Sequence, residues 1–327
     1  MVGAVLVRDD RIIAEGWHRS HGGAHAEVEC LAAFGNGTIP PDAVMYVTLE
    51  PCAHQGKTPP CADLLIARGV KSVVMAHADP NPQVNGHGIE RLEAAGIEVV
   101  VGDGAEEARW INRRFLHYHA TGRPWVVLKW AVSSDGFMDR HPRQLREVQR
   151  ITAPATDVLV HRWRSEEQAI AVGGRTVIND DPQLTVRHVV GSQPLRVVID
   201  SRGDLPAASE VFDRSSLTLL VTPLPRAIPE VDELVATDRS QALDELMTEL
   251  GRRGIQSVMV EGGAATIAEL LTTSLWNEAR VITGKVSFVQ GTKAPTFSAP
   301  VARTIEHDGD RIELFTAGKA PDPSWQW

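Results

Sequence analysis

The stretch Pro51-Cys52-Ala53-His54-Gln55-Gly56-Lys57-Thr58-Pro59-Pro60-Cys61 follows an apolar run, Val44 to Leu49, that has the composition of a strand. The prolines before Cys61 are typical of a helix start, and the helical pattern beyond them ends at Gly69. The stretch is therefore predicted to connect a strand to a helix. It places one cysteine after the strand and one in the first helical turn, which indicates an α/β fold.

The flanking residues continue this alternation of short apolar runs and amphipathic segments. The predicted elements are a strand hairpin over Val2 to Val7 and Arg11 to Ala14, a helix over His25 to Phe34, strands over Ser72 to Ala76 and Ile97 to Val101 around a helix ending near Gly96, and an amphipathic segment over Ala105 to Ala120. Gly122 and Pro124 then separate two patterned blocks. We therefore predict two domains, residues 1–122 and 123–327.

The second block is also mixed α/β. Its predicted strands are Trp125 to Trp130, Leu195 to Ile199, Leu217 to Val221 and Ser257 to Val260, and its predicted helices are Thr152 to Arg164, Gln241 to Leu250 and Ala264 to Leu271. Two stretches are predicted as loops, the charged one from Asp139 to Arg150 and the proline-containing one from Thr222 to Thr237.

Charge and composition exclude several classes of function. The 327 residues carry 33 Lys and Arg against 42 Asp and Glu, a net charge of −9, which disfavours nucleic acid and anionic membranes as partners. Any phosphate must therefore be bound by a local cluster of donors. Three cysteines are too few for a disulfide framework, and the opening apolar run is too short for a signal peptide. No stretch approaches the roughly 18 apolar residues of a membrane span, so a cytoplasmic protein with small-molecule partners is predicted.

Three candidate metal ligands are spread over the first domain: His25, Cys52 and Cys61. One imidazole and two thiolates suit Zn²⁺, and three protein ligands leave a coordination position for water, as in catalytic zinc sites. Glu27, two residues from the histidine, is placed to move a proton between that water and a leaving group. Each residue alone is more often a packing or surface residue, but the joint pattern favours zinc. Cys30, inside the same helix, is predicted to pack in the core.

The His-x-Glu and Pro-Cys elements are part of the zinc deaminase signature. With the long gap before Cys61 and the segment Asp79-Pro80-Asn81-Pro82, the first block resembles the deaminase half of the bifunctional riboflavin-biosynthesis deaminase-reductases. The second block resembles the reductase half of the same family, so the resemblance covers essentially the whole chain. It implies a cytidine-deaminase-like zinc domain followed by a dihydrofolate-reductase-like α/β domain that uses NADPH.

In the first domain, the resemblance implies that His25, Cys52 and Cys61 hold zinc and that Glu27 is the proton shuttle. It also implies a pyrimidine and ribose-phosphate pocket, lined by His18, His54, Lys57, Asp79 and Asn81. The Lys57 ammonium suits a substrate phosphate, with a solvated loop lysine as the alternative. The family usually carries a helix and an Asn-Pro segment before the first strand, at which this chain begins. Either the start is assigned too late or the domain is truncated, and one sheet face is expected to be less covered.

In the second domain, glycines follow apolar strands at Gly173-Gly174 and Gly262-Gly263, where backbone amides can approach a phosphate. A Gly-x-Gly-x-x-Gly pattern with an acidic residue about 20 positions later is missing, which disfavours an ordinary Rossmann domain. The resemblance implies NADPH near Val132, Thr176, Ser201, Gly263, Ala264, Ala265 and Thr266, and substrate near Arg164, Asp180, Leu184, Arg187 and Glu261.

Two features of the second domain bear on phosphate and aromatic contacts. The guanidinium groups of Arg164 and Arg187 have the planar fork that suits a ribose phosphate. Where the family commonly has Ser-x-Trp, this sequence has Val148-Gln149-Arg150, so Arg150 would offer a planar cation in place of the aromatic ring.

Three functions stay open from the sequence. The first is a bifunctional enzyme that deaminates a 2,5-diamino-6-(phosphoribosylamino)pyrimidinone and then reduces the ribosyl group to a ribityl chain with NADPH. The second is a reductase alone, with the first domain as a structural or oligomerisation module. The third is a non-enzymatic zinc module, which would need a fourth ligand such as His54. Members of the family often associate, so a homo-oligomer is compatible with the sequence, but no subunit number follows from it.

Overall fold

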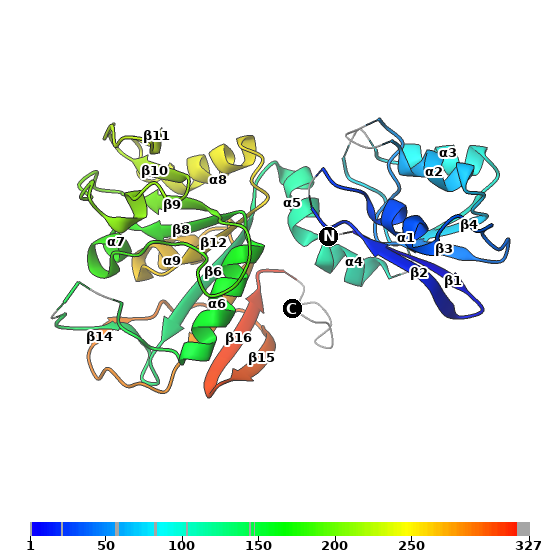
Figure 1. The fold of residues 1–327 in the computed structure, drawn as a ribbon. Coiled ribbons are helices and arrows are strands. Elements are labelled where there is room, and N and C mark those ends of the chain that lie inside the picture. The colour runs from blue at the N-terminus through cyan, green and yellow to red at the C-terminus, as the bar shows by residue number, and fades with distance from the viewer. Residues whose placement is uncertain are drawn as a thin grey trace. The chain divides into compact units, whose positions relative to one another are not determined.

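The computed structural model describes residues 2–20, 22–55, 59–81, 84–102, 104–143, 145–146 and 148–318. The chain forms two compact units, residues 1–120 and 121–327, each with a mixed α/β fold (Figure 1). Among the described residues, no helix is long and apolar enough to cross a membrane.

A five-stranded sheet, in the order β2-β1-β3-β4-β5, forms the centre of the first unit. Its strands are β1 (Gly3–Arg8), β2 (Arg11–Trp17), β3 (Val44–Val47), β4 (Ser72–Met75) and β5 (Glu98–Val101). The first hairpin is antiparallel, and its turn residues Asp9 and Asp10 both have positive φ, 49° and 56°, as a tight hairpin turn requires. Strands β3, β4 and β5 run parallel, which places the ends of β3 and β4 at the same edge of the sheet.

Three helices pack on one face of this sheet: α1 (Ala26–Phe34), α2 (Cys61–Ala67) and α3 (His87–Ala94). The core between them contains Leu6, Met45 and Leu65, and Cys30 is fully buried there, as predicted. On the other face, Tyr46 and Val100 are 37% and 44% exposed. The described part of that face is therefore incompletely covered.

The segment from 105 to 120 forms two helices instead of one continuous helix. α4 (Ala105–Ile111) ends at Asn112, which is buried, and α5 (Arg113–Thr121) begins directly after it. The sequence pattern is helical on both sides of Asn112, so only the backbone break at this residue separates the two elements.

The second unit contains a nine-stranded sheet in the order β11-β10-β9-β8-β12-β6-β13-β16-β15. Its strands are β6 (Trp125–Val132), β8 (Ala169–Gly173), β9 (Leu195–Ile199), β10 (Thr218–Thr222), β11 (Asp232–Val235), β12 (Ser257–Glu261), β13 (Glu278–Thr283), β15 (Val301–His307) and β16 (Asp310–Thr316). The strands from β11 to β13 are parallel, and β16 and β15 complete the sheet in antiparallel orientation. A separate two-stranded sheet pairs β7 (Phe137–Arg140) with β14 (Gly291–Lys293).

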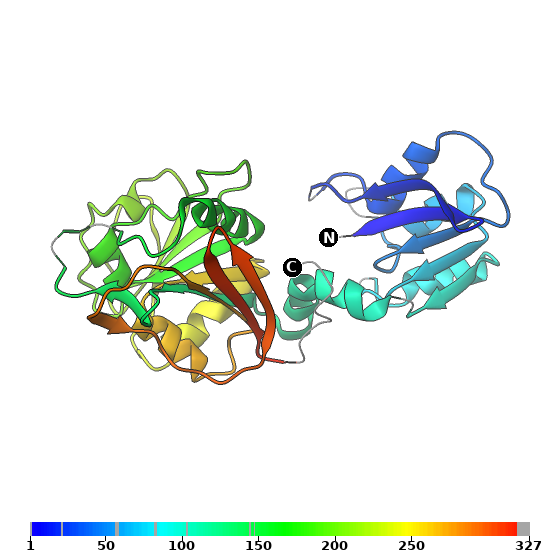
Figure 2. The same cartoon turned by 90° about the horizontal axis from the view of Figure 1, so that it is seen from below.

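Helices cover both faces of the large sheet (Figure 2). On one face, α8 (Ala242–Arg252) and α9 (Ala264–Leu271) enclose a core that includes Leu246 and Ile267. On the other, α6 (Pro154–Glu166) and α7 (Gly174–Asp180) enclose Val160 and Val177, near the short 3₁₀ helix η1 (Glu210–Phe212). Strands β8, β10 and β12 are buried along their whole length, which explains their continuous apolar runs.

The loop prediction for Thr222 to Thr237 is wrong in part, because residues Asp232–Val235 form β11. This edge strand pairs with β10 through its backbone while its terminal side chains are exposed, so its composition resembles that of a loop. In the other predicted loop, Asp139 and Arg140 belong to β7, and the described residues from His141 to Arg150 contain no helix or strand.

Candidate active sites

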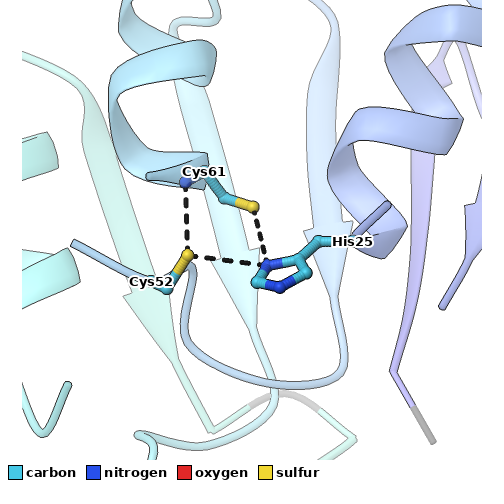
Figure 3. A group of neighbouring side chains, drawn as sticks. All are labelled: His25, Cys52 and Cys61. Atoms are coloured by element: carbon cyan, nitrogen blue, oxygen red, sulfur yellow. Dashed lines mark hydrogen bonds between the residues drawn. The ribbon is translucent and has the colours of Figure 1, made fainter. Parts of the chain in front are cut away.

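The three candidate metal ligands of the first unit converge (Figure 3). The Nδ1 atom of His25 lies 3.2 Å from the Sγ of Cys61 and 3.5 Å from the Sγ of Cys52, and all three atoms lie within 4.8 Å of one another. Zn–S and Zn–N bonds at tetrahedral angles would separate nitrogen from sulfur by about 3.6 Å. The spacing and the donor set therefore both fit a zinc ion.

Local structure explains why these residues meet. His25 precedes the first residue of α1, and Cys61 is the first residue of α2. The backbone N–H of Cys61 donates to the Cys52 sulfur at 3.3 Å, and the N–H of Ala62 donates to the Cys52 carbonyl at 3.1 Å. The start of α2 thus holds the segment that follows β3. Among the described residues, one group of His, Cys, Asp or Glu side chains is arranged to hold a metal ion. It consists of His25, Cys52 and Cys61.

The two thiols shift each other's pKa in opposite directions. A hydrogen bond from Cys61 and the neighbouring His25 lower the pKa of Cys52 to about 4, against the effect of burial. The hydrogen bond to Cys52, together with burial, raises the pKa of Cys61 instead. The positive end of the α2 dipole favours a thiolate at Cys61, its first residue, but the neighbouring Cys52 sulfur outweighs this effect. A divalent cation would displace the proton of the Cys61 thiol and stabilise both thiolates.

Glu27 lies beside the ligands and is almost completely buried, with 3% of its surface exposed. Burial raises its pKa to about 6, and its carboxyl interacts with the Cys61 side chain. A carboxyl group that titrates near neutral pH can both accept and release a proton, as a proton shuttle must.

Of the residues expected to bind the pyrimidine, His18 lies beside the metal ligand His25. The His18 ring packs edge-on against His25, with ring centroids 5.6 Å apart, and its Nδ1 lies 2.9 Å from the Ala24 carbonyl oxygen. Asp79 is buried and accepts the backbone N–H of Asn81 at 2.8 Å, and burial raises the pKa of its carboxyl. Lys57 lies outside the described residues.

Two buried histidine nitrogens have no hydrogen-bond partner within the described part of the chain: Nδ1 of His54 and Nε2 of His77. His77 was not singled out in the sequence; it follows β4 and donates through Nδ1 to the Ala78 carbonyl at 3.0 Å if that nitrogen carries the proton. Buried polar atoms normally have a hydrogen-bond partner, so a bound polar ligand would supply the missing partner of both nitrogens.

Glu50 is a further residue that the sequence did not reveal. Its buried carboxylate accepts four backbone N–H groups: those of Asp79 and Gly86 at 3.0 Å, Gly88 at 2.8 Å and Ile89 at 3.3 Å. A Cβ atom at Gly88 would lie 2.0 Å from the Pro51 carbonyl oxygen, so only glycine allows this close approach. Glu50 therefore joins the zinc-ligand segment to the loop that carries Asp79.

The second unit holds a cavity of about 800 Å³ at the ends of β6, β8 and β12. All the predicted substrate residues line it, namely Arg164, Asp180, Leu184, Arg187 and Glu261. Most predicted cofactor residues line it as well, namely Thr176, Ser201, Gly263, Ala264, Ala265 and Thr266. Val132 does not; it is buried in the core between the sheet and α8 and α9.

Both glycine turns open into this cavity. A Cβ at Gly173 would lie 2.5 Å from the Thr266 hydroxyl, and one at Gly263 would lie 3.2 Å from the Thr176 hydroxyl. Gly262 and Gly263 have φ of 70° and 75°, and Gly263 is followed directly by α9. Backbone amides, a helix start and two threonine hydroxyls thus meet at one place, which fits the phosphate groups of a dinucleotide such as NADPH.

A buried charge cluster also lines the cavity. The Glu261 carboxylate accepts from Nε and Nη2 of Arg164 at 2.5 and 2.9 Å, and the Lys129 Nζ lies 3.8 Å away. Burial alone would raise the pKa of Glu261, but Arg164 and Lys129 lower it to about 2. Burial lowers the pKa of Lys129. Lys129 was missed in the sequence, although a charged residue within the apolar run from 125 to 130 is a signal that could have found it.

Two arginines of the charged segment from Asp139 to Arg150 form ion pairs with residues that line the cavity. Arg143 forms an ion pair with Asp180, whose pKa is raised by burial despite this partner. Arg150, where the family commonly has tryptophan, forms an ion pair with Asp157 of α6, and both residues line the cavity. The planar cation expected from the sequence is therefore present, held by a carboxylate.

The fold and the two sites agree with comparisons to known proteins. Residues 1–77 match the cytidine and deoxycytidylate deaminase zinc-binding region, and residues 124–297 match the RibD C-terminal domain. The chain is thus a bifunctional enzyme, with a zinc-dependent deaminase domain followed by an NADPH-dependent reductase domain.

The similarity to individual proteins extends over most of the chain. The riboflavin biosynthesis protein RibD of Chlamydia pneumoniae is 40% identical over 86% of this chain and 78% of its own length, and that of Escherichia coli K12 is 38% identical over 85% and 79%. The Thermotoga maritima deaminase/reductase structure superposes with a TM-score of 0.86 at 33% identity, covering 96% of this chain and 91% of that chain. An Acinetobacter baumannii RibD structure gives 0.85 at 34% identity, covering 97% and 92%. The chain belongs to the RibD family.

Family membership confirms the resemblance and the bifunctional interpretation. Both halves of the chain match their family models, and the first half has a complete set of zinc ligands beside Glu27. A reductase that keeps its first domain only as a structural module is therefore not favoured.

Proposed function

We propose that the first domain, residues 1–122, deaminates 2,5-diamino-6-(5-phosphoribosylamino)pyrimidin-4(3H)-one, and that the second, residues 123–327, reduces the ribosyl group of the product to a ribityl chain. The relative from Thermotoga maritima is described as a diaminohydroxyphosphoribosylaminopyrimidine deaminase and 5-amino-6-(5-phosphoribosylamino)uracil reductase. The observation that carries the proposal is the convergence of His25, Cys52 and Cys61 beside the buried Glu27.

In the deaminase domain, the two thiolates and the imidazole would hold Zn²⁺, which when bound lowers the pKa of a water molecule to about 7. Glu27 accepts a proton from the attacking water on its carboxylate and delivers it to the amino nitrogen, which leaves as ammonia. Its pKa of about 6 makes both protonation states accessible at neutral pH. His18, His54, Lys57, Asp79 and Asn81 orient the pyrimidine and its ribose phosphate.

In the reductase domain, NADPH when bound supplies a hydride. Thr176, Ser201 and residues 263–266 bind this cofactor, with the start of α9 facing its phosphates. The substrate is bound in the same cavity by Arg164, Asp180, Leu184, Arg187 and Glu261. The cluster of Lys129, Arg164 and Glu261 carries one net positive charge, which suits a phosphorylated substrate.

The test follows ammonia release and NADPH oxidation separately on the purified protein. We expect Glu27→Gln to keep zinc but to lose ammonia release by at least about 100-fold, because the amide cannot carry the proton. Reductase activity with the deaminated substrate should be unchanged. The matched control is Glu29→Gln, two residues further along α1, where the carboxylate is partly exposed and pairs with Arg19 at 3.7 Å. Full deaminase activity of Glu27→Gln would refute the assigned shuttle.

Small phosphorylated pyrimidines are the proposed ligands, and a cytoplasmic location is proposed with them. All three cysteines of the chain are free thiols, and two of them have a ligand role that requires the reduced form.

A further inference from the structure

The guanidinium group of Arg164, a central cation of the reductase cavity, already has protein partners. Arg164 directs Nε and Nη2 to Glu261, and its Nη1 donates to the Thr185 carbonyl at 3.2 Å. Its charge is therefore balanced inside the protein. An incoming phosphate needs donors that are not already committed in this way.

His161, on α6, has such a donor. It lines the cavity with only 5% of its surface exposed. Its Nδ1 lies 3.0 Å from the backbone nitrogen of Arg187 and accepts that N–H. When the ring is neutral, its single proton must consequently sit on Nε2. Nε2 makes no hydrogen bond to any residue that the structure describes.

The surroundings keep this ring neutral. Burial, followed by the positive charge of Arg164 and the neighbouring His188 and Arg187, lowers the pKa of His161 to about 4, and Glu261 opposes this only weakly. The His188 ring packs edge-on against it, with centroids 4.4 Å apart. At neutral pH, His161 therefore presents an uncharged N–H.

The same ring is linked to a cationic side chain that lines the cavity. Arg187 uses Nη1 to contact Gln183 and Thr185, at 3.3 and 3.0 Å. Its other guanidinium nitrogens make no hydrogen bond to a residue that the structure describes, and its backbone N–H is bound by His161. The His161 side chain thus supplies a neutral N–H donor at Nε2, and through Nδ1 it positions the charged Arg187.

We propose that His161 is a further substrate-binding residue of the reductase site, with Nε2–H donating to a phosphate oxygen of the substrate while Nδ1 positions Arg187 for the same phosphate. The inference rests on the proposed reductase function. It assigns the phosphate to His161 and Arg187, whereas Arg164 contributes to the substrate site by balancing the charge of Glu261.

Two substitutions separate the two nitrogens. In His161→Asn, the side-chain oxygen lies near the Nδ1 position and can still accept the Arg187 N–H, but no group remains at the Nε2 position. In His161→Gln, the amide nitrogen reaches the Nε2 position and can still donate. A hydrogen bond to a charged group is worth enough to predict a rise of about tenfold or more in the substrate KM of His161→Asn. His161→Gln keeps this donor but loses the Nδ1 acceptor that positions Arg187, so its substrate KM should rise by a smaller factor, about threefold. The NADPH KM should not change in either variant.

The matched control is His307→Asn, which makes the same change on β15 at a residue that does not line the cavity. It should leave every kinetic constant unchanged. An unchanged substrate KM in His161→Asn, an equal loss in both His161 variants, or a rise in the NADPH KM instead of the substrate KM would each overturn the assignment.

A second measurement uses the unmodified full-length protein with ribose 5-phosphate as the probe. Nitrogen NMR of the histidine rings should show His161 as the neutral Nε2–H form, and its Nε2 signal should shift when the probe binds. An unshifted signal at saturating probe would overturn the inference, even if the variants do not fold. If the wild type binds the probe through His161 but does not oxidise NADPH with the pyrimidine substrate, the proposed function fails while this inference stands.

Discussion

The Glu50 carboxylate accepts the backbone N–H of Asp79 at 3.0 Å, although the two residues lie 29 positions apart in the sequence. Glu50 stands two residues before Cys52, and Asp79 belongs to the proposed pyrimidine pocket. The same carboxylate also binds the first turn of α3. A single buried side chain therefore sets the distance between the proposed metal site and the proposed substrate loop.

Glu50→Gln should raise the deaminase KM by about tenfold while zinc content and reductase kinetics stay unchanged. The amide presents an NH₂ group to N–H donors that need an acceptor, so the loop carrying Asp79 loses part of its anchor. Steady-state ammonia release and metal analysis of the same sample make the measurement. Glu93→Gln on the exposed side of α3 is the control. A variant with wild-type KM would show that the anchor does not position the loop.

Removal of zinc by a chelator should abolish ammonia release and leave NADPH oxidation within about twofold of its starting rate. The described cluster of metal ligands lies entirely in the first compact unit, whereas the reductase cavity lies in the second. Metal analysis should find one zinc per chain before treatment, and added Zn²⁺ should restore activity. Parallel loss of both activities contradicts this expectation.

Arg164→Ala should destabilise the reductase domain by about 3–5 kcal/mol, because it leaves the buried Glu261 carboxylate without its main partner. The double variant Arg164→Met, Glu261→Leu should be more stable than Arg164→Ala, since no unpaired carboxylate remains. Denaturant unfolding of the wild type, the single variant and the double variant measures these differences. If the double variant is the less stable of the two, the ion pair itself contributes more than its burial costs.

The reductase domain should lose stability as the pH falls from about 6.5 to about 4. The unfolded chain binds a proton at His161 near its ordinary pKa of 6.5, whereas the native pKa is about 4, so only the unfolded state gains the proton between these values. This contribution is fully present above pH 6.5. Unfolding free energies at pH 7.5 and 5.0 should differ less in His161→Asn than in the wild type. Equal differences in both proteins would remove His161 as the cause.

The sequence allowed the periodic elements to be predicted well, because their patterns follow from burial. β9 and α9 have the predicted bounds, Leu195–Ile199 and Ala264–Leu271. The three ligand residues were recognisable because imidazole and thiolate side chains have a narrow range of chemistry. β11 was missed because an exposed edge strand is defined by backbone pairing with β10, which leaves little trace in side-chain composition.

The residues missed at the sites act through contacts that form only in the folded chain. In the sequence, Glu50 is an ordinary acidic residue, because the backbone N–H groups of Asp79 and Ile89 reach it only in the folded chain. His161 gains its fixed tautomer from a backbone N–H 26 positions away. Neither contact leaves a spacing or a repeat in the sequence. Chemical type was therefore predictable at both sites, whereas the positioning residues were not.

The hydrophobic cores of the two compact units have no residue in common. The buried cluster of the first unit lies between Ala4 and Ile97, and the two clusters of the second begin at Val126. A reading frame split after codon 120 would give each product a complete apolar interior of its own. Each compact unit therefore has an apolar interior of its own, which is the condition for expressing either half of this enzyme as a separately folding fragment.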